Sequence, residues 1–128
     1  MKEFYHMRTS FYNLKLTLSF LLLLLLFSCQ NSVTFEDLKG EWKSVKAKRN
    51  GRETQTLDKV FFSFSQSDSI TTNLFGQIET YPMKYDYPVI KLKSSNLEEI
   101  NVLSLDGDTL SISMRIRQYR YDFELLKR

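Results

Sequence analysis

The sequence predicts an all-β domain of sequential antiparallel strands. Eight apolar and β-branched runs of six to nine residues follow one another between residues 42 and 126, and turn residues separate them. No helix-length stretch with a period of 3.6 residues lies between any two runs, which excludes parallel βαβ units. Each run has one apolar face. The sheet must therefore close on itself or form a two-sheet sandwich to bury that face and remove its edges.

A short helical turn is expected before the strands. Thr34 can cap the segment TFEDL, with Asp37 three residues further on. Asn50-Gly51 is expected to turn the chain after the first strand, and Pro82 inside the fourth strand implies a bulge or a sheet edge. The eight strands are expected at 42–48, 59–65, 69–75, 78–86, 89–94, 100–105, 109–116 and 119–126.

The apolar pattern also predicts how the last strands pair. Asp106-Gly107 predicts a tight turn, which places Leu103 and Leu105 on the same face as Leu110 and Ile112. In the last hairpin apolar residues are matched on one face and opposite charges on the other. The expected pairs are Ile116–Tyr121, Met114–Phe123, Ile112–Leu125 and Arg115–Asp122.

Residues 1–28 are expected to be a signal peptide that is excluded from the fold. The apolar run over 16–27 has 12 residues, interrupted only by Thr17 and Ser19. At about 1.5 Å per residue it spans roughly 18 Å, short of the ~30 Å hydrocarbon layer of a membrane, and it lacks the polar stripe of a core helix. Basic residues precede it and small polar residues follow it, as in secretion signals. A start at Met7 gives the same layout.

Cys29 is expected to carry a lipid anchor. The segment Leu26-Phe27-Ser28-Cys29 resembles the lipobox of bacterial lipoproteins, in which the cysteine is acylated and becomes the first residue of the mature chain. It is the single cysteine of the chain, and acylation would remove a free thiol from an exported protein. Residues 29–33 then form a lipidated tether. Gln30 stands where many inner-membrane lipoproteins have Asp, so we expect the outer membrane, on its periplasmic side.

The remaining chain resembles the lipocalin-like domains of small bacterial envelope lipoproteins. The segment LKGEWKS contains Gly40-x-Trp42 after a helical turn, and the hairpin SLDGDTLSIS and the closing YDFELLK are also similar. The resemblance covers about 34–127. It implies an up-and-down eight-stranded β-barrel over 34–128, with Gly40 and Trp42 at the barrel floor. It also implies an arginine over the Trp ring, with Arg115, Arg117 and Arg120 as candidates.

The composition of the mature chain argues against an enzyme. Without residues 1–28, 15 of the 18 basic and 14 of the 15 acidic residues remain, so the net charge of +3 falls to +1 and nucleic-acid binding is not expected. His6 is the single histidine and lies in the signal peptide, which leaves no His or Cys for catalysis or metal binding. Asp106 and Asp108 are interpreted as turn residues, and Glu98-Glu99 as solvated charge. We expect no cofactor.

The inward aromatic side chains are the remaining candidates for function. An eight-stranded barrel is just wide enough for packed side chains or one small ligand. The resemblance favours a membrane-anchored binder or carrier of a small hydrophobic molecule. The alternative is a filled barrel that contacts a protein partner through its loops. The residues expected to line the interior are Phe62, Phe64, Tyr81, Tyr85, Asn101, Ile112, Met114, Tyr121 and Phe123.

Overall fold

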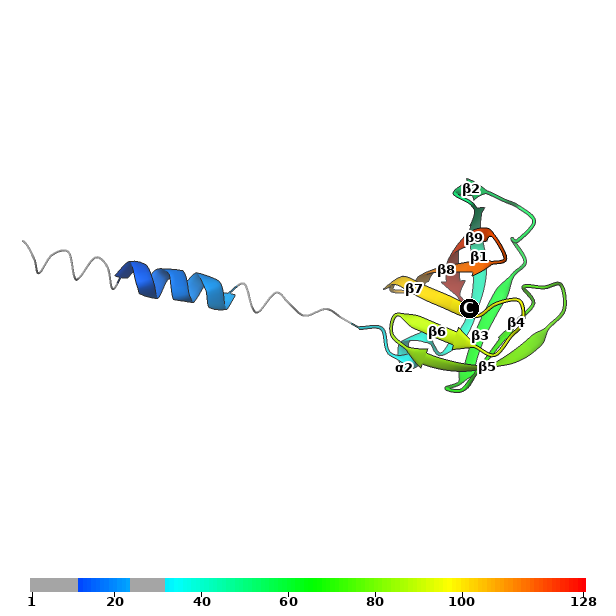
Figure 1. Cartoon of the computed structure of the whole chain (residues 1–128), viewed down its shortest axis with the longest axis horizontal. Coiled ribbons are helices and arrows are strands. Elements are labelled where there is room, and N and C mark those ends of the chain that lie inside the picture. Colours follow the sequence, from blue (N-terminus) through cyan, green and yellow to red (C-terminus); the bar gives the residue numbers. More distant parts are fainter. Residues whose placement is uncertain (1–11, 24–31) are drawn as a thin grey trace, which may run out of the picture. The chain divides into compact units, whose positions relative to one another are not determined.

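The computed structural model describes residues 12–23 and 32–128 (Figure 1). The chain divides into two compact units between Asn31 and Ser32. Residues 12–23 are helical with exposed side chains. Within the described ranges, no helix is both long enough and apolar enough to cross a membrane. Cys29 and lipobox residues 26–28 lie outside these ranges.

Residues 32–128 form a closed antiparallel barrel, which confirms the predicted fold. The strands follow chain order around the sheet, and β1 pairs with β9 to close it. β2 pairs only with the end of β1 and lies outside the barrel. The elements are α2 (Phe35–Leu38), β1 (Gly40–Arg49), β2 (Arg52–Glu53), β3 (Phe61–Gln66), β4 (Ser69–Thr72), β5 (Glu79–Asp86), β6 (Val89–Leu92), β7 (Glu99–Asp106), β8 (Thr109–Ile116) and β9 (Tyr119–Lys127).

The antiparallel order places the connections at two ends of the barrel. We call one end the floor, which consists of α2 and the turns at 67–68, 87–88 and 107–108. We call the other the loop end, which consists of the connections 50–60, 73–78, 93–98 and 117–118. Figure 1 shows α2 and β2 at opposite ends of β1.

The last hairpin differs from the predicted pairing by two residues. Ile116 lies opposite Tyr119, and Arg115 lies opposite Arg120 instead of Asp122. The cause is a two-residue turn at 117–118, in which Arg117 has a φ of 57°. Tight hairpin turns require such a positive φ. The turn at 117–118 contains no glycine, so the sequence gives no indication of it. A shift of two residues keeps every side chain on its predicted face.

A bulge in β7 changes the face of two residues that were expected to point inward. Val102 pairs with Ile112 and Ser104 with Ser111, so one extra residue lies between them. Such an insertion breaks the alternation of faces. Leu105 remains half-buried against the core, whereas Leu103 is 52% exposed. Asn101 also lies on the outward face, so its predicted place in the barrel interior is wrong.

The turn after β7 and the proline in β5 also differ from expectation. Asp106 pairs with Thr109, so the turn residues are Gly107 and Asp108, and Gly107 has a φ of 58°. Pro82 pairs with Ser69 in an unbroken register. Its nitrogen faces the β6 side, where pairing begins only at the next residue, Met83. The missing N–H is therefore tolerated at the end of a ladder, without a bulge.

One hydrophobic core fills the barrel. Its members come from every barrel strand, from α2 and from two loop-end connections, which contribute Val60 and Leu97. Leu57 and Leu74 are partly buried against it. Both ends of the barrel therefore contribute apolar side chains to the same core.

Candidate functional site

The barrel interior contains most of the residues that the sequence assigned to it. Five of them are at most 2% exposed: Phe62, Phe64, Ile112, Met114 and Phe123. The rings of Phe62 and Phe123 meet edge to face, with centroids 5.6 Å apart and an interplanar angle of 74°. This geometry is typical of packed aromatic pairs.

These buried side chains leave no room for a ligand beside them. Phe62, Phe64 and Ile112 are 0% exposed, as are Ile90 and Ile100 across the barrel. A side chain without accessible surface borders no space as large as a water molecule, whereas a ligand cavity would expose the side chains that line it. The middle of the barrel is therefore packed like an ordinary protein core.

One polar group lies inside this packing without a partner. Ser44 on β1 is 3% exposed, and its Oγ has no hydrogen-bond partner among the described residues. Its neighbour across the strands is Leu125 on β9. Ser44 and Ala47 are the small inward residues of β1, and Ala47 lies opposite Phe123 on β9.

The three inward tyrosines lie nearer the ends of the barrel and are half-buried. The Tyr85 hydroxyl donates to the carbonyl oxygen of Val33 at 2.5 Å, and burial raises the pKa of Tyr85 to about 12. The Tyr81 hydroxyl donates to the Glu79 carboxylate, which is the main reason that the pKa of Tyr81 is also raised to about 12. Both hydroxyls thus have protein partners and do not require a bound ligand.

Gly40 and Trp42 form the barrel floor together with α2. Trp42 is 0% exposed, and its indole N–H donates to the Leu38 carbonyl oxygen at 2.8 Å. Lys127 Nζ lies 5.4 Å from the centroid of the Trp42 ring. A Cβ at Gly40 would lie 3.1 Å from Lys127 Cε, and the φ of Gly40 is 123°. The glycine therefore permits both the backbone bend and the passage of Lys127 over the ring.

The cation over Trp42 is thus a lysine and not one of the three expected arginines. Trp42 pairs with Lys127 where β9 closes the barrel against β1. Arg115, Arg117 and Arg120 lie at the opposite end of β8 and β9, near the loop end. The side chain that covers Trp42 depends on the pairing of β9 with β1. A strand pattern that is read in chain order does not specify this pairing.

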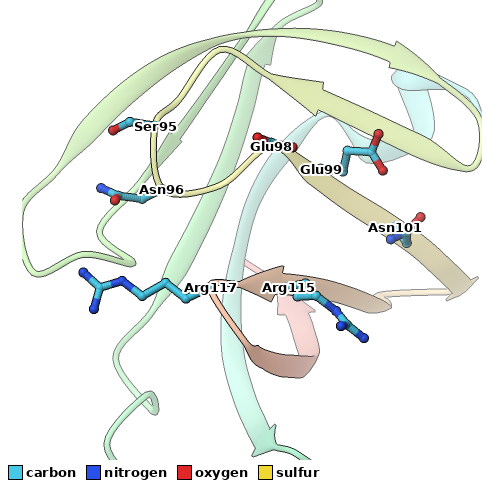
Figure 2. A pocket seen from close by; sticks show the side chains of 7 residues that line it. All are labelled: Ser95, Asn96, Glu98, Glu99, Asn101, Arg115 and Arg117. Carbon is cyan, nitrogen blue, oxygen red and sulfur yellow. The ribbon is translucent and has the colours of Figure 1, made fainter.

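An open polar hollow of about 620 Å³ lies at the loop end (Figure 2). Its walls come from the 93–98 connection, from the outward face of β7 and from the tip of the β8–β9 hairpin. In this view Arg117 extends toward the side of Ser95 and Asn96, and Arg115 lies on the side of Asn101. The lining residues are Ser95, Asn96, Glu98, Glu99, Asn101, Arg115 and Arg117.

The charged groups of this hollow are not paired with one another. Arg115, Arg117, Glu98 and Glu99 take part in none of the ion pairs found within the described residues. All four are exposed. Guanidinium groups bind carboxylates through two parallel hydrogen bonds, but exposed charges contribute little individually. The hollow suits a broad polar contact better than a tight small-molecule site.

Two more hollows continue this surface across the outer face of the barrel. One of about 300 Å³ shares Asn101 and Arg115 with the first. The third hollow, of about 580 Å³, extends over β8 and β9 to β1 and shares Leu103 and Arg120 with the smaller one. Two small outward residues of β8 line these hollows: Ser111 lines the larger one and Ser113 the smaller one. We call these three hollows together the outer strip.

The sequence did not single out the outer strip. Its residues come from connections and strands that are far apart in the chain, and each of them has the pattern of a solvated outer face. Arg115 and Arg117 are both exposed. A signal existed only in the two small residues Ser111 and Ser113, which line these hollows between longer side chains.

In the part of the chain that the structure describes, no group of three or more His, Cys, Asp or Glu side chains is placed to hold a metal ion. No protein-family model matches the sequence, and no curated protein matches it either. The barrel fold and its surface are therefore the basis for a functional interpretation.

Proposed function

We propose that this chain is a lipid-anchored envelope protein whose filled barrel is an interaction module, and that a protein partner binds it at the loop end. In this proposal the barrel neither catalyses a reaction nor encloses a hydrophobic ligand. The observation that supports it is the packing of the interior, where Phe62, Phe64 and Ile112 have no accessible surface. The exposed, unpaired charges of the loop-end hollow offer a contact surface instead.

The proposed anchor rests on the sequence. The lipobox-like segment at 26–29 places one cysteine directly after an apolar run, and acylation by several chains holds a protein firmly at a membrane. Changing Cys29→Ser should move the protein from the membrane fraction and leave it unacylated. A variant with the same membrane partition and the same attached mass as the wild type would exclude this anchor.

Overpacking the interior distinguishes the interaction module from a carrier. Ile112 is 0% exposed, so in a filled core Ile112→Phe should lower the free energy of unfolding by about 1–3 kcal/mol. Leu103→Phe is the matched control, because Leu103 lies on the neighbouring strand and is 52% exposed. The wild type should not take up a fluorescent fatty acid. If Ile112→Phe stabilises the protein and abolishes uptake of the probe, the barrel is a carrier.

The loop-end contact is tested by exchanging charge. Cross-linking of intact cells should give a partner adduct that is lost in Arg115→Glu/Arg117→Glu and retained in Lys39→Glu/Lys84→Glu, which changes two exposed lysines elsewhere. An adduct that survives the arginine exchange unchanged would place the contact outside the hollow.

A further inference from the structure

The chain enters the barrel domain at a fixed point on the floor. Val33 is half-buried against the core, and its carbonyl oxygen accepts the Tyr85 hydroxyl at 2.5 Å. The next residue caps α2: the Thr34 N–H donates to Asp37 Oδ2 at 2.8 Å, and the Asp37 N–H donates to Thr34 Oγ1 at 3.4 Å. Leu38 at the end of α2 is fully buried. These contacts hold residue 33 to the floor.

The chain between this point and the proposed lipid anchor is short. Four peptide links join Cys29 to Val33, and four residues span at most about 14 Å when fully extended. β8 has eight residues, which corresponds to about 26 Å along the strand and about 20 Å along an axis tilted by ~40°. The link is therefore shorter than the barrel is tall, and it cannot bring the loop end to the membrane.

Charge does not attract the floor to a membrane surface. Its connections carry Glu36, Asp37, Asp68 and Asp108, and the cations at this end are Lys39, Lys127 and Arg128. Charges of the two signs nearly balance on this face, so anionic lipids attract it little within a Debye length of roughly 8–10 Å. Any preference of the floor for the membrane must therefore come from the length of the link and not from electrostatic adhesion.

We propose that the bilayer that holds the Cys29 acyl chains faces the floor of the barrel, and that the loop end with its polar hollow points away from it. This inference depends on the acylation of Cys29 proposed above. It assigns the floor to the lipid surface and leaves the loop end free for a partner. The four peptide links between Cys29 and Val33 are too short for the loop end to reach the bilayer.

Thiol labels at the two ends test the orientation in the acylated protein. Asp68→Cys places a label on the floor and Gln118→Cys places one at the loop end; both positions are exposed turn residues. The acylated Cys29 leaves the introduced thiol as the only free one. In phosphatidylcholine vesicles with a headgroup quencher, the label at 68 should be quenched several-fold more than the label at 118. Equal quenching, or stronger quenching at 118, would overturn the orientation.

A longer link tests whether the short link is the cause of the orientation. Inserting 20 Gly and Ser residues between Gln30 and Asn31 gives a flexible link with a mean span of about 27 Å, enough for the domain to turn over. The difference between the two labels should then largely disappear. A difference that persists would mean that adhesion of the floor, and not the link, orients the barrel.

Flotation of every variant with the vesicles is measured first. Protein that does not float contradicts the proposed anchor. Protein that floats but shows equal quenching of the two labels contradicts only the orientation.

Discussion

The floor and the loop end of the barrel are stabilised in different ways. At the floor, Trp42 and Leu38 are fully buried and joined by a hydrogen bond, and Lys127 covers the indole ring. At the loop end, Val60 and Leu97 close the core, but Arg115 and Arg117 remain exposed without ion-pair partners in the described residues. Both ends therefore contribute to stability, and the loop end also has polar groups available for binding.

Removing the indole should have the largest effect on stability. Trp42→Ala deletes a fully buried ring, which typically costs about 3–5 kcal/mol. A domain of this size has a stability of roughly 5–10 kcal/mol, so the variant should be marginally stable or unfolded. Arg117→Ala at the loop end is the control and should change the unfolding free energy by less than about 0.5 kcal/mol. Similar melting temperatures for both variants would show that the side chains at 42 and 117 contribute equally to stability.

Gly40→Ala should have the next largest effect. The φ of 123° at this position is rarely adopted by residues with a Cβ, and the new methyl group would lie 3.1 Å from Lys127 Cε. Such backbone strain costs about 1–3 kcal/mol. Chemical denaturation should reveal the loss, and Lys127→Ala, alone and combined with Gly40→Ala, should reveal how much of it comes from the side-chain contact. Unchanged stability of Gly40→Ala would mean that this glycine is not required for the floor.

The Tyr85 hydroxyl should make the floor sensitive to alkaline pH. Burial raises the pKa of Tyr85 from 10.0 to about 12, so the folded state keeps a proton that the unfolded chain loses. The resulting stabilisation is complete below pH 10 and is lost as the pH rises to about 12. Tyr85→Phe should lower stability at pH 7 by about 1 kcal/mol and flatten the pH dependence between these values. Tyr87→Phe serves as a control for a lost hydroxyl. A steep alkaline loss that persists in Tyr85→Phe would contradict the assignment.

Ser44→Ala should have the smallest effect, and of opposite sign. The Ser44 hydroxyl is buried without a partner in the described chain, and removing an unsatisfied polar group is neutral or stabilising. We expect a melting temperature equal to or slightly above that of the wild type. A loss of more than about 1 kcal/mol would show that the hydroxyl makes a hydrogen bond that supports the core.

The sequence predicted the barrel and its floor because their signals are local. Alternating runs specify strands, Thr34 with Asp37 specifies the cap of α2, and Gly40-x-Trp42 specifies the floor. The details that the sequence did not predict depend on the backbone conformation at single residues. Arg117 adopts a φ of 57° and shifts the last hairpin, and one extra residue in β7 turns Leu103 outward.

The outer strip was missed for a different reason. Lys46 and Arg120 come together only after β1 pairs with β9, and no local pattern distinguishes the residues of the strip from an ordinary solvated face. The position of Lys127 over Trp42 likewise depends on the pairing of β9 with β1. Contacts that depend on closure require the register of the whole sheet, which strand patterns alone do not provide.

Native mass spectrometry of the chain beginning at Gln30 tests the central proposal, the filled barrel, most directly. With Cys29 removed, no acyl chain contributes to the mass. A filled barrel predicts a single species with the mass of the polypeptide alone, because Phe62, Phe64 and Ile112 have no accessible surface beside which a ligand could lie. A heavier species that loses an apolar compound on denaturation would contradict the filled barrel and establish a carrier.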